Sequence, residues 1–324
     1  MRLLFLRGKV PTDRDPKQIM FNKLSENCDM WTQLAAKISM GGCGRIWYWG
    51  GTRQVRYSGT FIETWLKSFG SGAVNLACDF EPNTIFARGG FPEYDKILAE
   101  FPKAYKIYYG AGKRYFPQTK FKQYDLILVD TLEQRKGAQD RFSKTRVELL
   151  VKPAADNIFK PVVGQKKIYD VIFVGNESKG DMKGHRFVLS HIPPGLKVLV
   201  VGIASKKLKR KYQGVTFTGW VPRRKLPKYY AQSKIAVIAC VEKDSGPRVL
   251  AEALACGCPV LVRAGLRCDV AKYVNSSTGM ITADCNFAQD VTMMVVSYEG
   301  FNAREYYLKN LSLDVAADNI RSML

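Results

Sequence analysis

Two carboxylates on either side of a glycine–proline turn are the residues of this sequence best suited to chemistry. Asp244 and Glu252 are eight positions apart, and Gly246 and Pro247 between them predict a turn that opens a helix. Gly257 predicts the end of that helix. The first turn of a helix presents unpaired backbone N–H groups and the positive end of the helix dipole, and both attract anions. This segment is therefore predicted to bind a ligand that carries phosphate and sugar hydroxyl groups.

The elements that must position these residues follow from an alternation of short apolar runs with segments of helical periodicity. Such alternation predicts parallel sheets wrapped by helices, so the expected fold class is α/β with two doubly wound domains. The domains are expected at 1–160 and 169–300, joined by a linker at 161–168 and followed by a helical segment at 301–324. Ligands of such folds bind at the carboxyl ends of the strands, here between the domains.

Individual elements are predicted from the same patterns. In the first domain the predicted strands lie at 2–8, 45–51, 73–79, 103–112 and 124–131, and the predicted helices at 29–38, 60–69, 92–101 and 132–142. In the second domain the predicted strands lie at 169–176, 197–202, 215–220, 234–240 and 259–264, and the predicted helices at 226–233 and 245–257.

Several segments, in chain order, resemble the GT-B glycosyltransferases of the family-4 type. EALACGCPV at 252–260, with the acid and the turn before it, is similar to the C-terminal signature of that family. VIFVGNESKGDMKGHRF at 171–187 resembles the first strand of its donor domain, and GVTFTGWVPRRKLPKYYAQSKIAVIAC at 214–240 resembles the next two strands. The stretch 301–324 resembles the helices that cross back to the N-terminal domain. The resemblance implies two Rossmann-like domains that face a cleft.

The resemblance also implies a chemistry: transfer with retention from a nucleotide-sugar donor, a UDP- or GDP-sugar, without a required metal. It assigns Glu252 to the donor ribose, Asp244 to the transferred sugar and Lys183 to the departing diphosphate. The sequence departs from the family pattern at Asp244, where glutamate is usual, and at Asn176, where arginine is usual and Lys179 is the candidate replacement. The implied donor-binding residues are Gly8, Gly175, Asn176, Lys179, Lys183, Gly219, Trp220, Val221, Ser245, Gly246, Pro247, Arg248, Val249 and Glu252.

Candidate bases for an acceptor hydroxyl stand at or near predicted strand ends, where carboxylates can reach a bound ligand. They are Asp13, Asp15, Asp79 and Asp130, and Asp13 joins Asp244 and Lys183 as a candidate catalytic residue. Asp13-Arg14-Asp15 is also an Asp-x-Asp pattern that could hold a metal, but its place in a loop after the first strand favours an acceptor role.

Histidine offers no candidate in the first domain, because His185 and His191 are the only two in the chain. His185 directly follows Lys183-Gly184, so a position in the cleft and a packed or surface position both remain open.

The charge balance points to a polyanionic partner. Fifty Lys and Arg oppose 29 Asp and Glu, which gives a net charge of +21, and such an excess attracts nucleic acid or an anionic membrane. DNA carrying hydroxymethylated bases is the favoured acceptor, a phage-type modification, and a bacterial cell-surface or lipid-linked glycan is the alternative. A non-catalytic nucleic-acid-binding protein on the same scaffold is a further alternative. The candidate contacts are Arg14, Arg88, Lys113, Arg114, Lys207, Lys209, Arg210, Arg223 and Arg224.

The cysteines and the apolar runs predict a cytoplasmic protein, in the host cytoplasm if it is phage-encoded, with peripheral membrane association as the alternative. None of the eight cysteines forms a Cys-x-x-Cys pair, so buried free thiols are expected in segments such as NLACDF and IAVIAC, which contain Cys78 and Cys240. No run of about 18 apolar residues predicts a membrane-spanning helix.

Overall fold

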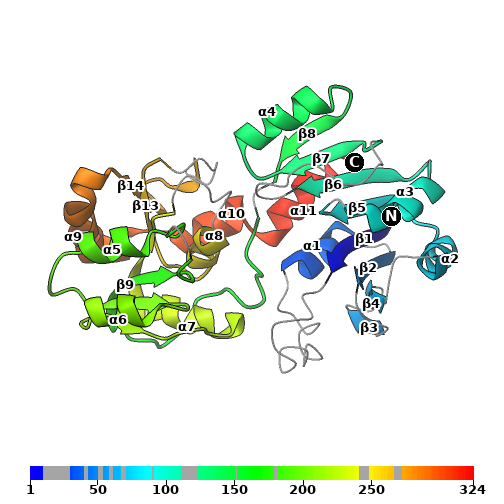
Figure 1. Cartoon of the computed structure of the whole chain (residues 1–324). Coiled ribbons are helices and arrows are strands. Elements are labelled where there is room, and N and C mark those ends of the chain that lie inside the picture. Colours follow the sequence, from blue (N-terminus) through cyan, green and yellow to red (C-terminus); the bar gives the residue numbers. More distant parts are fainter. Residues whose placement is uncertain are drawn as a thin grey trace. The chain divides into compact units, whose positions relative to one another are not determined.

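The computed structural model divides the chain into two compact units, each built on its own sheet (Figure 1). The first unit contains Met1–Leu150 and Ala316–Leu324, and the second contains Val151–Val315. The structure describes residues 1–9, 30–39, 43–49, 54–57, 61–66, 71–89, 91–110, 123–150, 152–178, 181–240, 248–265 and 272–324.

The first unit has an eight-stranded sheet in the order β3-β4-β2-β1-β5-β6-β7-β8. Neighbouring strands are parallel, except that β3 runs antiparallel to β4. The strands are β1 (Arg2–Lys9), β2 (Cys43–Trp49), β3 (Gln54–Tyr57), β4 (Phe61–Leu66), β5 (Thr84–Arg88), β6 (Tyr105–Gly110), β7 (Leu126–Val129) and β8 (Arg146–Leu149). The helices are α1 (Met30–Ile38), α2 (Ser71–Phe80), α3 (Asp95–Glu100), α4 (Leu132–Arg141) and α11 (Leu313–Arg321), with a short 3-10 turn η2 (Pro92–Tyr94).

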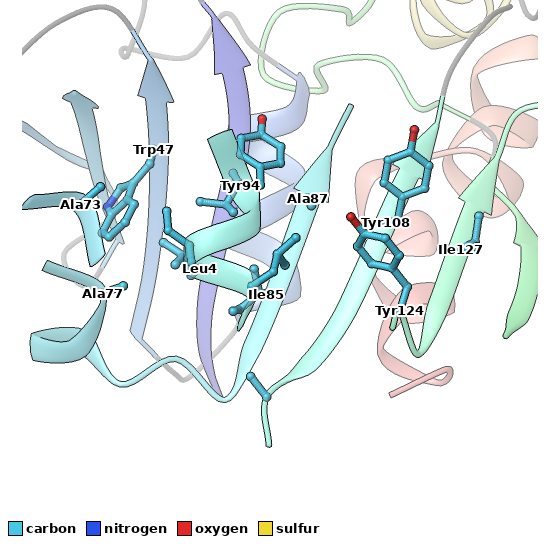
Figure 2. Packing of buried hydrophobic residues seen from close by; sticks show 14 of the residues in the cluster. Leu4, Trp47, Ala73, Ala77, Ile85, Ala87, Tyr94, Tyr108, Tyr124 and Ile127 are labelled. Carbon is cyan, nitrogen blue, oxygen red and sulfur yellow. The ribbon is translucent and has the colours of Figure 1, made fainter. Parts of the chain in front are cut away.

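The apolar run at the start of the chain is buried on both faces of this sheet, as expected for a central parallel strand. Leu4 lies on one face near Ile85 and Tyr94, in a cluster that also contains Ala73 and Ala77 of α2 and Tyr108 of β6, as Figure 2 shows. Phe5 points to the other face, where its ring stacks on that of Phe86 at 4.6 Å between centroids and lies 6.1 Å from that of Trp31 in α1. Burial of these side chains fixes β1 at the centre of the sheet.

The sequence prediction is wrong between residues 60 and 80. The segment predicted as a helix at 60–69 contains strand β4, which pairs with β2 and β3. The segment predicted as a strand at 73–79 lies in helix α2. Ala73, Ala77 and Phe80 are spaced by one helical turn and are all buried against the sheet, which a strand could not achieve. Phe, Ile, Thr and Trp in β4 favour a strand.

The second unit has a six-stranded parallel sheet in the order β11-β10-β9-β12-β13-β14. The strands are β9 (Tyr169–Val174), β10 (Val198–Val201), β11 (Thr216–Phe217), β12 (Ser233–Ile238), β13 (Val260–Arg263) and β14 (Gly279–Thr282). The helices are α5 (His185–His191), α6 (Lys206–Lys211), α7 (Leu226–Ala231), α8 (Arg248–Ala255), α9 (Phe287–Ser297) and α10 (Ala303–Asn310), with 3-10 turns at η4 (Arg223–Lys225), η6 (Asp284–Asn286) and η7 (Tyr298–Gly300).

The strand order reverses between β9 and β12. The chain moves outward from β9 to β10 and β11, then returns to β12 on the other side of β9. The side chains of α5, α6 and α9 form one core with the sheet. Helix α8 contacts both α7 and α10, and none of these three helices contributes to that core. Such a reversal opens a crevice at the carboxyl ends of the two strands, which is the usual ligand site of open α/β sheets. The predicted fold class, α/β with two parallel-sheet domains, is confirmed.

Candidate functional site

The carboxyl ends of β9, β10 and β11 meet through glycines. The N–H of Gly202 donates to the carbonyl of Gly219 at 3.0 Å, and a Cβ on Gly202 would lie only 2.1 Å from the carbonyl oxygen of Gly175. Gly202 also has a φ of +142°, which side-chain-bearing residues rarely adopt. Asn176 holds the adjoining loop, because its Oδ1 accepts a hydrogen bond from the N–H of Ile203 at 2.8 Å. This edge therefore presents backbone rather than side chains.

Lys183 lies beside this glycine edge, just before helix α5. A Cβ on Gly175 would meet the Lys183 Cγ at 3.2 Å, so the lysine side chain passes directly over the end of β9. The next residue, Gly184, has a φ of +80° and approaches the carbonyl of Ala239 at the end of β12 so closely that a Cβ would lie 2.2 Å from that oxygen. The lysine is thus placed where the strand order reverses.

Asp181 fixes the start of α5. Its carboxylate accepts hydrogen bonds from the N–H groups of His185 at 2.8 Å and Arg186 at 2.9 Å, which satisfies two of the otherwise unpaired donors of the helix. Asp181 adopts a φ of +50°, in the left-handed region that aspartate tolerates better than most residues.

His185 is a packed core residue. Its side chain is fully buried, its Nε2 lies 3.1 Å from the carbonyl oxygen of Gly175, and its ring meets that of Phe173 edge-on at 4.8 Å. Of the two positions that the sequence left open for this histidine, the structure shows the packed one. His191 lies exposed at the end of α5 and stacks on Phe187.

Glu252 on α8 is buried and bound to an arginine. Only 4% of Glu252 is exposed, and its Oε1 accepts hydrogen bonds from Arg223 Nη2 at 2.6 Å and Arg223 Nε at 3.1 Å. The guanidinium also lies over the ring of Phe159, 5.2 Å from its centroid. A charge-assisted pair of this kind offsets the cost of burying a carboxylate. Sequence reasoning assigned Glu252 to the donor site and Arg223 to the polyanion contacts, so it missed the pair.

Tyr230 of α7 lies fully buried near this pair. Burial is the main cause, and the negative charge of Glu252 the next, of a pKa of the Tyr230 hydroxyl well above its ordinary value. Among the described residues this hydroxyl has no hydrogen-bond partner. The sequence offered no signal for it, because a tyrosine in an amphipathic helix is usually packing.

An exposed apolar residue follows each of the two hydrogen-bonded glycines, Gly202 and Gly219. Ile203 is 53% exposed, and Trp220, directly after Gly219, is 54% exposed. Val221 beside it is partly buried. An exposed indole next to bare backbone offers a flat surface on which an aromatic base can stack.

The first unit gathers a second polar group at the ends of its strands. Asp130, which follows β7, is buried and accepts a hydrogen bond from the hydroxyl of Tyr109 in β6. The ring of Trp31 lies 4.6 Å from that of Tyr109, and the guanidinium of Arg88, at the end of β5, lies 5.0 Å from the Trp31 ring. The structure thus brings Arg88 and Asp130 to one edge of the sheet.

Asp79 does not share that edge. It was expected at the end of a strand, but it lies exposed in helix α2 because the segment 73–79 is helical. The same error affects Cys78, which is exposed on α2 rather than buried. Cys240 is buried as expected.

The remaining candidates fall into two groups. Within the described chain, Gly8 lies where the pairing of β1 with β2 shifts register, Arg248 and Val249 open α8, and Lys207, Lys209, Arg210 and Arg224 are exposed on α6 and η4. Outside it lie Asp13, Arg14, Asp15, Lys113, Arg114, Lys179, Asp244, Ser245, Gly246 and Pro247.

Neither a metal-binding cluster nor a membrane-spanning helix is found among the residues that the structure describes. Over these residues, no cluster of three or more His, Cys, Asp and Glu side chains is arranged to bind a metal ion. No helix among them has the length and apolar character to cross a membrane.

Comparison with known families and structures gives a consistent result. Residues 169–295 match the family described as glycosyl transferases group 1. The structure is similar to a sucrose-phosphate synthase from Thermosynechococcus elongatus, with a TM-score of 0.67 and 14% identity over 99% of this chain and 98% of that one. It is similar to a glycosyltransferase from Rickettsia africae, with a TM-score of 0.72 and 13% identity over 99% and 97%.

A third similar structure is HepE from Anabaena in complex with UDP and glucose, with a TM-score of 0.64 and 13% identity over 99% of this chain and 98% of that one. These structural likenesses confirm the predicted GT-B fold. No curated protein sequence gives a significant match to the chain.

Proposed function

We propose that this chain, whose residues 169–295 match the family of group 1 glycosyl transferases, moves a sugar from a nucleotide-sugar donor to a hydroxyl group of a polyanionic acceptor. The observation that carries the proposal is the buried Glu252 on α8, whose carboxylate binds Arg223 of η4. Helix α8 follows β12, one of the two strands between which the strand order reverses. A similar structure, HepE, binds UDP and glucose. We extend the proposal to retention of configuration, on the sequence resemblance alone.

The donor parts are assigned to the second unit. Glu252 accepts hydrogen bonds from the ribose hydroxyls, and the backbone at Gly219 with the exposed Trp220 receives the base. Lys183, over the end of β9, neutralises the negative charge that develops as the sugar–phosphate bond breaks and the diphosphate leaves. Asp244 and the turn before α8 complete this proposed site on sequence grounds.

The acceptor is proposed from charge. Residues 182–241 contain no Asp or Glu, and α6 presents five exposed basic side chains around the buried Leu208. Among the described residues none of these five forms a salt bridge. Such a surface attracts the closely spaced phosphates of duplex DNA. We therefore propose hydroxymethylated bases in DNA as the acceptor, which requires the base to leave the stack.

The donor site is tested by thermal unfolding with UDP-, GDP-, ADP- and CMP-sugars. A ligand that binds only the folded protein raises its melting temperature, so one of these sugars should stabilise the chain. The stabilisation should disappear in Glu252→Gln and persist in Glu133→Gln, which changes an exposed glutamate of α4. If no sugar nucleotide stabilises the protein, the proposal is wrong.

The acceptor is tested with a radiolabelled sugar from the donor that binds. Label should enter hydroxymethylated duplex DNA and not unmodified DNA of the same sequence. Label in a glycolipid carried by anionic vesicles would contradict the DNA assignment and support the membrane glycan. Binding to DNA without transfer or hydrolysis of any donor would instead indicate the non-catalytic protein.

A further inference from the structure

The two neighbouring arginines of η4 have different surroundings. Arg223 is partly buried and binds Glu252, whereas Arg224 is exposed, and no described residue forms a salt bridge with it. We infer that Arg223 is a positioning residue for the donor site rather than a contact for a polyanion. It holds one oxygen of Glu252 so that the other oxygen faces the ribose hydroxyls of the nucleotide. This inference rests on the proposed function.

The geometry of the pair leaves half of the carboxylate available. Arginine and carboxylate often pair with one hydrogen bond to each oxygen. Here Arg223 Nε and Nη2 both donate to Oε1, at 3.1 and 2.6 Å. Within the described part of the chain, no residue donates a hydrogen bond to Oε2. A carboxylate held in this way can accept from a ligand hydroxyl without giving up its arginine.

Arg223 is itself held in place. Its guanidinium lies 5.2 Å from the ring centroid of Phe159, which is fully buried, and only 25% of its side chain is exposed. A planar guanidinium fixed by a ring on one side and a carboxylate on the other loses little further freedom when a ligand binds. The pair is therefore organised before the donor arrives.

No other described group can replace Arg223. Glu252 lies in a run of six buried residues on α8, from Leu250 to Ala255, and no other cation bonds to it. The buried hydroxyl of Tyr230 makes no hydrogen bond to it in this structure. Removing the guanidinium would leave a buried carboxylate without its fixed orientation.

The inference predicts discrimination at the sugar of the nucleotide. A hydrogen bond to a fixed carboxylate is stronger than one to a neutral acceptor, and losing it changes affinity by about tenfold or more. The wild-type protein should therefore bind UDP, or GDP if that is its nucleotide, about tenfold more tightly than the 2′-deoxy form. Isothermal titration calorimetry with UDP and 2′-deoxy-UDP, and with GDP and 2′-deoxy-GDP, measures this ratio of affinities.

Three variants test the role of Arg223. Arg223→Gln should bind the ribonucleotide more weakly and reduce the preference over the 2′-deoxynucleotide to about twofold or less. Arg223→Lys, which keeps the charge but not the two-pronged geometry, should recover part of the preference. Lys225→Gln, which changes an exposed lysine of the same 3-10 turn, is the matched control and should retain the wild-type ratio. Thermal unfolding without ligand checks the folding of each variant, and the lysine variant decides the matter if Arg223→Gln does not fold.

The outcomes separate this inference from the proposed function. If the wild-type protein binds neither UDP nor GDP, both fail. If it binds one and Glu252→Gln abolishes binding, while Arg223→Gln or Arg223→Lys keeps the wild-type ratio, the proposed function stands and the inference is overturned. Tighter binding by Arg223→Gln would also overturn it, because the arginine would then compete with the donor for Glu252.

Discussion

The hydroxyl of Tyr307 in α10 donates a hydrogen bond to the carboxylate of Asp156, which lies before the first strand of the second unit. The other oxygen of that carboxylate accepts from the N–H of Leu313 at 3.0 Å. The Tyr307 oxygen in turn accepts from the N–H of Ala154 at 3.1 Å. One buried tyrosine therefore joins the beginning and the end of the second unit.

Loss of this hydroxyl should destabilise the protein. Tyr307→Phe removes the hydrogen bond to Asp156 and takes the acceptor away from the N–H of the buried Ala154, which should cost about 1–3 kcal/mol in the free energy of unfolding. Tyr230→Phe removes a buried hydroxyl that has no hydrogen-bond partner among the described residues, so it should leave stability unchanged or raise it. Urea titration of both variants measures the difference. Equal losses in the two would contradict the assignment.

The cap of α5 should matter both to stability and to the donor site. Asp181→Gly keeps the left-handed backbone accessible but removes both hydrogen bonds to the carboxylate, and their loss should cost about 1–2 kcal/mol. Asp181→Asn should cost less. Since Lys183 lies between Asp181 and the two residues that Asp181 binds, the glycine variant should also bind the donor more weakly. Calorimetry gives both quantities, and Asp140→Gly, an exposed position of α4, is the control for a general glycine effect on a helix.

Asp170 should contribute to the acid sensitivity of the fold. Burial raises the pKa of this carboxyl, but hydrogen bonds from Lys234 Nζ at 2.7 Å and the Lys197 N–H at 2.8 Å outweigh burial and lower it. A carboxyl with a lowered folded-state pKa contributes stability that is fully present above its ordinary value of 3.8 and is lost as the pH falls through the folded value.

The stability that Asp170→Asn loses should therefore be constant from pH 5 to 7 and shrink below about pH 4. Urea midpoints at several pH values give the curve. A difference that grows as the pH falls would have the wrong sign and would contradict the assignment.

The buried thiols should resist chemical modification. Burial raises the pKa of the Cys258 thiol to about 12, and burial together with the charge of nearby groups raises that of Cys256 further. Thiolate is the reactive form, so both should react with iodoacetamide only after unfolding. Cys78 and Cys285, which are exposed, should react in the native protein. Mass spectrometry of tryptic peptides reads out each site, and rapid labelling of Cys258 in the folded protein would contradict the burial.

Much of the fold follows from the sequence because parallel strands buried on both faces are simple apolar runs. The runs in β1, β7, β9 and β12 are recognised for this reason. The prediction exchanges helix and strand between residues 60 and 80, and this error also has a physical cause. A short apolar run such as that of α2 satisfies both periods, and only the packing of Ala73, Ala77 and Phe80 on the sheet decides between them.

The site is less accessible to sequence reasoning than the fold. Glu252 and Lys183 stand out because the segments around them, 252–260 and 171–187, resemble those of a known family. The partner of Glu252 is 29 positions away, beyond any local periodicity, and Arg223 reads as one more member of a basic run. Asn176 stands where the family usually has arginine, and its Oδ1 accepts a hydrogen bond from the N–H of Ile203 after β10, a contact that no local pattern predicts.

The close approach at Gly202 limits how this protein can be altered. At Gly202 the backbone leaves no room for even a methyl group, so this position cannot be altered by point substitution. Directed evolution of what this edge accepts must therefore act through its neighbours, Ile203 and Trp220, whose side chains are open to solvent. A saturation library confined to those two positions would explore the variable part of the surface while the rigid part stays unchanged.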